Sequence, residues 1–570
     1  MTWGAHVDVK GSFRIPLASA IALPMAIALA VSGPATAAPA PARAAIPTAV
    51  ANDFNGDGYP DLVVTALYED VGPTVDEGAV HVLYGSALGV EADGVLAPDD
   101  QFWTGGIEGL QAPAEAGSQF GWSTAAGDFN GDGFADLAIA VPYLDVGTVK
   151  DAGAVEVVYG SAAGLQDTGV GGPDDQLWTQ DSPGVEDQSD PGEAMGRAVA
   201  TGDFNGDGFQ DLAVDVRGEN VGTATEAGAV MVVYGSSTGL QADGTGGPDD
   251  QFWTQGSNGL QDQPETKDWF GRGLATGDFN GDGYQDLAAG CFLEDLGTSK
   301  DAGAVEVLYG SSTGLQADGT GGPDDQFWTQ GSGGVKDRPE LGDYFGHTVA
   351  AGDFNHDGFA DLAIASRLED TFGSKDTGAV EVLYGSSTGL QADGTGGPDD
   401  QFMNQGSTSV KDDPRPGDQF GFSLAVADFN GDSFADLAVG IPFKNVRPMH
   451  PDAGEVAVLY GSAVGLQAVS PDDQMWNQDS ADVQDQAGTN DQFGISEGTG
   501  DYNGDGWADL AVGIHNETVG AVTQAGAVSV LSGGPGGLQA DLPDDQLWSQ
   551  GVGGVQDVAE IDDEFGWWVT

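Results

Sequence analysis

The stretch DFNGDGYPD, residues 53–61, places the carboxylates of Asp53, Asp57 and Asp61 and the amide of Asn55 in one short turn. Two carboxylates about 4 Å apart repel by roughly 4 kcal/mol at an effective dielectric near 20, so such a turn needs a cation. Side-chain oxygens at loop positions 1, 3, 5 and 9, a backbone carbonyl at position 7 and a glycine at position 6 indicate a calcium loop, although the bidentate glutamate at position 12 is missing. An all-oxygen ligand set without His or Cys favours calcium over zinc or copper.

The same nine-residue pattern recurs six more times, at spacings of 75 residues five times and then 73. One such loop could be an ordinary Asp- and Gly-rich turn, but a fixed long period indicates a repeat architecture. The sequence therefore predicts up to seven bound Ca²⁺ ions. The expected side-chain ligands are Asp53, Asn55, Asp57, Asp61, Asp128, Asn130, Asp132, Asp136, Asp203, Asn205, Asp207, Asp211, Asp278, Asn280, Asp282, Asp286, Asp353, Asn355, Asp357, Asp361, Asp428, Asn430, Asp432, Asp436, Asp501, Asn503, Asp505 and Asp509.

Two of these loops depart from the pattern. His356 replaces the glycine at position 4 of the fifth loop, where a side chain can usually point to solvent. Ser433 replaces the glycine at position 6 of the sixth loop, where we expect a positive φ. A non-glycine residue in that conformation costs on the order of 1 kcal/mol or more, so we expect the loop that starts at Asp428 to be the weakest calcium site.

The composition is that of an acidic, folded chain. There are 90 acidic and 17 basic residues, a formal charge of -73, which argues against binding nucleic acid or an anionic membrane surface. Hydrophobic residues make up 40% of the chain and the aromatic residues recur in register, which argues against a disordered polyanion. The single cysteine, Cys291, excludes an internal disulfide framework. Metal ions are then the available cross-links.

The N-terminus has the features of a secretory signal. Lys10 and Arg14 precede an uncharged apolar run over residues 15–31, and a small-residue stretch with a cleavage site after Ala37 follows. The alternative is a retained membrane anchor, but the run is close to the minimum spanning length and is interrupted by Pro24. We therefore predict a signal peptide over residues 1–37, an Ala/Pro-rich linker over 38–45, and a mature protein that is secreted or at the cell surface, without a membrane span.

Each repeat contains four short β-like runs. In the second repeat they are FGWSTAAG (120–127), DLAIAVP (136–142), GAVEVVYGS (153–161) and PDDQLWTQ (173–180), separated by turn residues. The second and third runs are apolar nearly throughout, which predicts strands buried on both faces. Four strands per unit, repeated radially, is the design of a β-propeller. The predicted fold is all-β, a seven-bladed β-propeller over residues 46–570 with a calcium loop in each blade.

The chain ends suggest how the ring closes. A Phe-Gly pair, or Met195-Gly196 in one repeat, precedes six of the calcium loops, but none precedes the first. A seventh copy lies at the C-terminus as Phe565-Gly566. A C-terminal strand over 565–570 that pairs into the first blade would explain this arrangement and would remove an exposed sheet edge. Residues 46–50 could occupy the same strand position, and the C-terminus could instead be the stub of a truncated eighth repeat; we favour closure by the C-terminal strand.

These motifs resemble those of FG-GAP repeat proteins, such as the seven-bladed propeller at the N-terminus of integrin alpha chains. The resemblance rests on the Phe-Gly pairs, on loops of the type DFNGDGFAD, and on the runs of the type DLAVG that follow, such as residues 436–440. The GAP element survives only approximately, as AVP at 140–142 and GIP at 440–442. The resemblance implies a propeller whose calcium is mostly structural and bound on the face away from the integrin ligand site.

The sequence does not favour an enzyme. The carboxylate pair of the PDDQ motif occurs in all seven repeats, so we interpret that motif as a turn or strand-edge feature rather than a catalytic pair. No Ser/His/Asp set is suggested by the histidines, and the glycine-rich runs lack the lysine of a phosphate-binding loop. We expect no catalytic residues and no organic cofactor.

We therefore expect a monomeric extracellular module for adhesion or recognition, with an unidentified protein or glycan as its ligand. The variable acidic loops that precede the GAV runs are the candidate recognition surface, including Lys444, Arg447 and His450. One alternative is an accessory propeller of an extracellular hydrolase, as in glycosylphosphatidylinositol-specific phospholipase D, which also carries FG-GAP repeats. The other is a purely structural protein of the cell surface. Uniform loops would favour the structural role, and divergent loops favour recognition.

Overall fold

The computed structural model describes residues 50–570 except 96, 108, 170–171, 245–246, 258, 320–321, 396, 408–409, 447–449, 470 and 542–544. The predicted signal peptide (1–37), the predicted linker (38–45) and residues 46–49 lie outside the described residues. The chain divides into two units, Met1–Ala44 and Ala45–Thr570, and all the described residues belong to the second.

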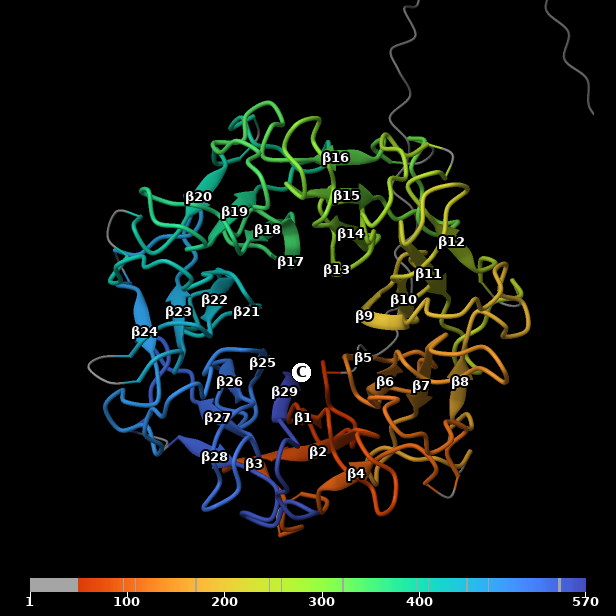
Figure 1. The fold of residues 1–570 in the computed structure, drawn as a ribbon, viewed down its shortest axis with the longest axis vertical. Helices are drawn as coiled ribbons and strands as arrows, with labels where there is room; N and C mark the ends of the chain where they lie inside the picture. Colours follow the sequence, from red (N-terminus) through yellow and green to blue (C-terminus); the bar gives the residue numbers. More distant parts are fainter. Residues whose placement is uncertain are drawn as a thin grey trace, which may run out of the picture. The chain divides into compact units, whose positions relative to one another are not determined.

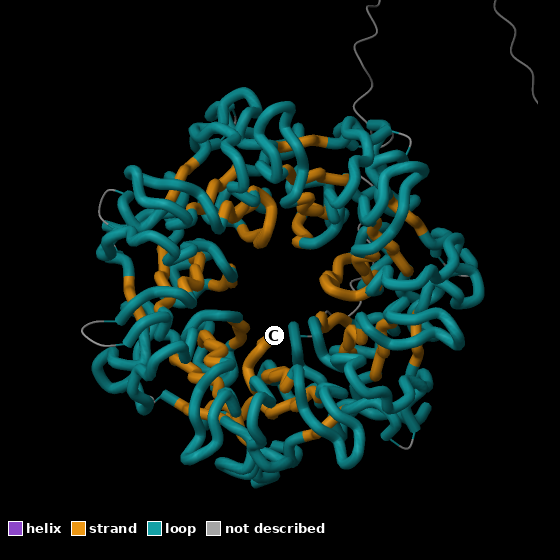
Figure 2. Tube along the Cα trace, viewed as in Figure 1, coloured by secondary structure: helices purple, strands orange, loops and turns teal. Residues whose placement is uncertain are grey.

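Seven antiparallel β-sheets surround a common axis (Figures 1 and 2), and all the regular structure of the described residues is β-strand. This confirms the all-β seven-bladed propeller. From the inner to the outer edge, the sheets are β29 (Phe565–Val569), β1 (Leu62–Ala66), β2 (Ala79–Ser86) and β4 (Gln101–Trp103), with β3 (Gly89–Glu91) also on β2; β5 (Thr124–Gly127), β6 (Asp136–Val141), β7 (Ala154–Val158) and β8 (Gln176–Trp178); β9 (Met195–Gly202), β10 (Asp211–Val216), β11 (Ala229–Val233) and β12 (Gln251–Trp253); β13 (Gly273–Gly277), β14 (Asp286–Cys291), β15 (Ala304–Leu308) and β16 (Gln326–Trp328); β17 (Phe345–Gly352), β18 (Asp361–Ser366), β19 (Ala379–Leu383) and β20 (Gln401–Met403); β21 (Leu424–Ala427), β22 (Asp436–Ile441), β23 (Glu455–Leu459) and β24 (Gln474–Trp476); and β25 (Glu497–Gly500), β26 (Asp509–Ile514), β27 (Ala527–Leu531) and β28 (Gln546–Trp548).

The core lies between neighbouring sheets. Every residue of β6 and β7 is buried, as the apolar runs predict for strands that are covered on both faces. One cluster joins Val63 and Val80 of the first sheet to Leu137 and Ile139 of the second. Each sheet thus buries its two faces against its two neighbours, and the apolar content of the second and third strands is explained by this packing.

The C-terminal strand completes the first sheet. β29 pairs antiparallel with β1, with Ala66 opposite Phe565 and Val64 opposite Val569. The backbone N–H of Val63 donates to the carbonyl of Thr570 over 2.9 Å, and the Thr570 N–H donates back over 3.0 Å. The inner strand of the first sheet therefore comes from the opposite end of the chain, whereas the other six inner strands precede their own second strands.

The PDDQ motif holds neighbouring sheets together. Gln101 donates from Nε2 to the carbonyl of Leu165 over 2.9 Å and accepts the Leu165 N–H at Oε1 over 3.0 Å. The second aspartate of the next copy, Asp175, accepts the backbone N–H of Gln111 over 2.7 Å. Both bonds join residues 64 positions apart. The motif is thus more than a turn or strand-edge feature, because it connects each sheet to the next.

Candidate functional site

The first acidic loop is held by its own backbone. It lies just before β1, and Oδ1 of Asp53 accepts the N–H groups of Gly56 and Asp57 over 2.7 and 3.1 Å. Oδ2 of Asp53 accepts the Gly58 N–H over 2.9 Å, and Oδ1 of Asp57 accepts the Tyr59 N–H over 3.1 Å. These hydrogen bonds close the loop into a single turn. The turn brings positions 1 and 5 together, as the spacing predicts.

The aspartate at position 9 anchors the loop to the sheet. Asp61 is 0% exposed. Its Oδ2 accepts the Phe54 N–H and its Oδ1 accepts the Gly85 N–H, both over 2.9 Å. The equivalent Asp136 makes the same bonds to Phe129 and Gly160. Each carboxylate oxygen can accept two hydrogen bonds or ligand bonds, so these contacts leave acceptor capacity on both oxygens.

The loop interior is electrostatically unfavourable for carboxylates. Burial raises the pKa of Asp61 well above its ordinary value, the bound N–H groups of Gly85 and Phe54 lower it, and the nearby charges of Asp53 and Asp57 raise it. Within the described chain, none of the three carboxylates pairs with a basic side chain. A cation in the loop would relieve both the burial and the repulsion.

Charged ligands alone do not complete a metal site. In the part of the chain that the structure describes, no three Asp, Glu, His or Cys side chains form a group that could hold a metal ion. An ion would also need the Asn oxygen at position 3 and the carbonyl at position 7. Six of the position-3 asparagines have a buried Nδ2 atom without a hydrogen-bond partner among the described residues. They are Asn55, Asn130, Asn205, Asn280, Asn355 and Asn430. The oxygen donors fit a hard cation, and the metal ligands remain a prediction.

In the second to fifth repeats, the glycine-rich connection before the PDDQ motif lies against the acidic loop of its own repeat. A Cβ atom added at Gly397 would lie 3.7 Å from Oδ2 of Asp357 in the fifth loop, and one added at Gly322 would lie 3.7 Å from Oδ2 of Asp282. Beside the fifth loop is a cavity of about 660 Å³, lined by Asn355, Asp357, Lys336, Asp399, Asp400 and Gln401 among others. At 3.7 Å a Cβ atom is in ordinary van der Waals contact, so the connection lies directly against the loop carboxylates.

The two departing loops keep the same shape. Ser433 has a φ of 73°, in the left-handed region expected at position 6, and its N–H donates to Oδ2 of Asp428 over 2.8 Å. His356 also has a positive φ, 56°, and its exposed ring lies 5.5 Å from the ring of Phe434. Position 4 therefore needs the left-handed conformation as well. The glycine found there in the six other loops was the signal for it.

Comparison with known proteins identifies the repeats. The family model "FG-GAP repeat" matches residues 48–83, 120–158, 195–233, 270–308, 345–383, 420–459 and 493–531, one match for each sheet. The chain belongs to the FG-GAP repeat proteins. The predicted resemblance to integrin alpha propellers is thereby confirmed, since integrin alpha chains are among the relatives of this FG-GAP propeller.

Integrin alpha-PS5 of Drosophila melanogaster is 32% identical over 171 residues, 30% of this chain and 14% of the relative. Integrin alpha pat-2 of Caenorhabditis elegans is 29% identical over 260 residues, 43% of this chain and 18% of the relative. Phosphatidylinositol-glycan-specific phospholipase D of Rattus norvegicus is 34% identical over 126 residues, 22% of this chain and 14% of the relative. The match therefore spans less than a fifth of each of these relatives.

Among solved structures, the exotype rhamnogalacturonan lyase YesX aligns over 89% of this chain and 82% of its own, at 10% identity and a TM-score of 0.38. That likeness is too low to support an argument about fold or activity. The described residues contain no helix that is long and apolar enough to span a membrane.

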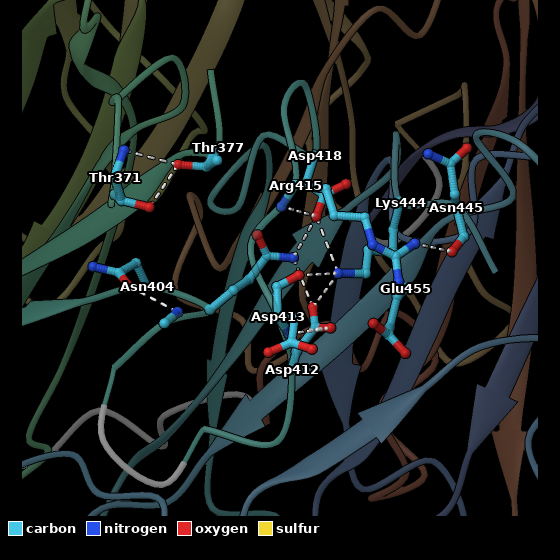
Figure 3. Close-up of polar contacts among 12 residues, drawn as sticks. Thr371, Thr377, Asn404, Asp412, Asp413, Arg415, Asp418, Lys444, Asn445 and Glu455 are labelled. Carbon is cyan, nitrogen blue, oxygen red and sulfur yellow. Dashed lines mark hydrogen bonds and ion pairs between the residues drawn. The ribbon is translucent and has the colours of Figure 1, made fainter. Parts of the chain in front are cut away.

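The expected recognition surface of this FG-GAP propeller needs a correction at Lys444. Only 4% of Lys444 is exposed, and its Nζ lies 2.6 Å from Oδ2 of Asp412 and 3.0 Å from Oδ2 of Asp418 (Figure 3). It also donates to the carbonyl of Asp413 over 3.0 Å. A lysine that is enclosed and paired in this way holds the loop together and is not available to a ligand.

The other two members of that predicted surface are His450 and Arg447. His450 is half-buried, and its backbone bridges to Val446 in both directions over 3.1 and 3.2 Å. Arg447 lies outside the described residues. The variable loops therefore remain a candidate surface without Lys444, and the role of the His450 side chain stays a prediction.

The sequence reading missed a second group of functional candidates. The residue directly after each Phe-Gly or Met-Gly pair is Trp122, Arg197, Arg272, His347, Phe422, Ile495 and Trp567 in the seven repeats. These residues come from the inner edges of the sheets, so they are neighbours around the axis although they are about 75 residues apart in sequence. The basic and aromatic character at one repeat position was the available signal.

Proposed function

We propose that this FG-GAP propeller is an extracellular recognition module whose seven acidic loops bind Ca²⁺. The observation that supports the proposal is the sevenfold recurrence of one all-oxygen loop, placed in the same way against the second strand of each sheet. In this role calcium is structural. It compensates the charge of the loop carboxylates, which in the first loop pair with no basic side chain of the described residues. It also fixes the turn that leads into the sheet.

Thermal unfolding tests the calcium proposal. Residues 38–570 are unfolded in chelator and across a calcium titration, with the bound calcium counted at saturation. We expect a count near seven and a melting temperature that rises with calcium, because an ion that binds only the folded chain stabilises it by mass action. No uptake and an unchanged melting temperature would refute the calcium proposal and leave the fold untouched.

Single substitutions make the test local. Asp57→Asn removes one predicted ligand charge from an exposed loop position and should lower the calcium count by about one. Asp99→Asn makes the same change at an exposed aspartate outside the loops and should leave the count unchanged. Equal calcium counts in the two variants would exclude Asp57 as a ligand.

The second candidate function is accessory to a hydrolase. The similarity to phosphatidylinositol-glycan-specific phospholipase D, at 34% identity over 126 residues, supports this alternative. Release of a glycosylphosphatidylinositol-anchored reporter from vesicles would test it. Release by the purified chain would favour the hydrolase role, and binding of the vesicles without release would favour an accessory role. An absence of both leaves recognition of another extracellular ligand as the proposal.

A further inference from the structure

Four arginines gather at the inner edge of three neighbouring sheets. Arg197 belongs to β9, Arg272 directly precedes β13, and Arg217 and Arg367 directly follow β10 and β18. Strands β9, β13 and β17 are neighbours at the inner edge of the ring (Figure 1). The chain has only 17 basic residues against 90 acidic ones, so four arginines in one place need an explanation. We call these four residues the arginine cluster.

The guanidinium groups of the arginine cluster are close enough to repel one another. The pKa of Arg272 is lowered to about 10, first by burial and then by the charge of Arg197. Arg367 and Arg217 lower it further, and Asp215 acts in the opposite direction. Like charges are seldom held together in a partly buried place unless something compensates them.

Compensation within the chain is incomplete. Over the described residues, Arg197, Arg217 and Arg272 form no ion pair and donate no side-chain hydrogen bond. Asp215 is fully buried, with Oδ1 accepting the Ala198 N–H over 2.7 Å. Glu226 also acts on Arg217, but two carboxylates do not balance four guanidinium charges. The terminal N–H donors of Arg197, Arg217 and Arg272 are therefore available to an external acceptor, whereas Arg367 donates from one terminal nitrogen to Oε1 of Gln419 over 3.2 Å.

Aromatic rings orient the guanidinium groups. The Cζ of Arg217 lies 3.7 Å from the ring centroid of Trp269, and the Cζ of Arg197 lies 4.1 Å from that of Trp122. Stacking on a ring face is favourable for a guanidinium and uses none of its in-plane N–H donors. The two stacks thus fix the planes of the Arg197 and Arg217 guanidinium groups without using their N–H donors.

Further aromatic residues line the same edge. Arg367 has its Cζ 5.6 Å from the ring of Tyr344 and 5.4 Å from that of Phe422. The ring of Phe292 lies 5.2 Å from that of Tyr344 and 5.1 Å from that of His347. The arginines are thus set among aromatic rings, of which those of Tyr344, His347 and Phe422 are partly exposed and could stack against a flat apolar group.

We propose that the arginine cluster binds an oxyanion carried on a flat apolar body, of which an aromatic carboxylate is the simplest example. Paired N–H donors of a guanidinium match the two oxygens of a carboxylate, and the surrounding rings can stack on the body that carries it. The charge of -73 disfavours anions over the rest of the surface. The inference deepens and rests on the proposed recognition role, and it does not involve the calcium loops, so the two can fail separately.

Benzoate is the probe for this site, because it joins a carboxylate to a flat ring. Its binding is followed by saturation-transfer NMR at a fixed calcium concentration, with acetate and sulfate as competitors. We expect one benzoate site, competition by sulfate, and weaker competition by acetate. Arg197→Gln/Arg272→Gln should weaken benzoate binding at least about tenfold, the loss expected when charge-assisted hydrogen bonds are removed. Arg338→Gln, which changes an arginine outside the cluster, should leave it unchanged.

The outcome that overturns the proposal is an absence of benzoate binding, or equal binding by the double variant and the Arg338→Gln control. If acetate competes as well as benzoate, the flat-body part of the proposal is wrong. If the double variant does not fold, Arg217→Gln alone should weaken benzoate binding several-fold, and unchanged binding would overturn the proposal. Without anion, Arg272→Gln should melt no lower than the unaltered chain, because it relieves repulsion within the cluster.

Discussion

Ser433 shows what a single side chain costs in an acidic loop. Its φ of 73° lies in the region that favours glycine, and the equivalent Gly58 has a φ of 94°. The Ser433 N–H still donates to Asp428 over 2.8 Å, much as Gly58 donates to Asp53 over 2.9 Å. The loop keeps its hydrogen bonds, so the difference between the two loops is backbone strain on the order of 1 kcal/mol.

Ser433→Gly should therefore raise the free energy of unfolding by up to about 1 kcal/mol and tighten calcium binding in the sixth loop. Urea unfolding in chelator measures the first effect, and a calcium titration of both chains measures the second. Ser374→Gly is the control. Ser374 is not among the residues with positive φ, so the added backbone freedom of glycine should lower the free energy of unfolding. A loss of stability in both variants would contradict the strain argument.

The role of Lys444 depends on its burial. Its side chain is 5% exposed and is paired with two carboxylates, whereas Lys375 is 76% exposed and lies 2.9 Å from Oδ1 of Asp376. Removing one partner of a buried pair leaves an uncompensated charge, and removing an exposed pair costs little. Lys444 and Lys375 therefore differ in energy although both form ion pairs.

Lys444→Met should lower the free energy of unfolding by roughly 3 kcal/mol or more, because Asp412 and Asp418 lose their cation. Lys375→Met, its exposed counterpart, should change it by less than about 1 kcal/mol. Urea unfolding at saturating calcium measures both variants. Similar losses in the two variants would show that burial does not decide the value of these pairs.

At the scale of the element, three of the third strands carry a buried glutamate. Glu156, Glu306 and Glu381 lie in β7, β15 and β19 and are at most 3% exposed. Burial raises the pKa of Glu306 to about 11, and the nearby Asp325 raises it as well. Burial and the nearby Asp400 raise the pKa of Glu381 to about 10, and burial and the nearby Asp175 raise that of Glu156 to about 9. The three strands can bury these glutamates because a protonated carboxylic acid is neutral and costs less to bury than a carboxylate.

The pH dependence of stability follows from these three groups. Each pKa is higher in the folded than in the unfolded chain, so each contribution is fully present below about pH 4.5 and is lost as the pH rises towards the folded value. Above pH 5 the loss is about 1.4 kcal/mol per pH unit for each group.

Glu306→Gln should therefore flatten the decline of stability between pH 5.5 and 9 by about that slope. Urea unfolding across this range at saturating calcium measures the effect. Glu340→Gln, at an exposed glutamate, is the control and should keep the slope of the unaltered chain. Identical slopes in all three chains would mean that Glu306 is ionised in the folded state.

For the whole molecule, ring closure by β29 is the decisive contact. Phe565 is fully buried, and one core cluster contains Phe565 and Val569 together with Val64 of β1 and Val528 of β27. Gln546 further links the last sheet to the first through both backbone groups of Val90, at 2.9 and 3.0 Å. The strand completes the first sheet and joins the two ends of the ring.

Removal of residues 565–570 should lower the melting temperature by well over 5 °C, because a buried strand and its hydrogen bonds are lost and β1 gains an exposed edge. A permuted chain with residues 564–570 joined ahead of residue 50 should regain most of this loss, since the other inner strands lead directly into their acidic loops. Scanning calorimetry compares the three chains. An unchanged melting temperature after truncation would show that another segment closes the ring.

The sequence alone determined the repeat, the strands and the number of sheets, because turn residues and apolar runs act over a few neighbouring positions and recur with a fixed period. It also placed the acidic side chains of each loop together, since they lie within nine residues. The tertiary structure decided the rest. The links between PDDQ motifs, the burial of Lys444 and the gathering of the four arginines join residues tens of positions apart. Such contacts depend on how neighbouring sheets pack around the axis, which no local pattern encodes.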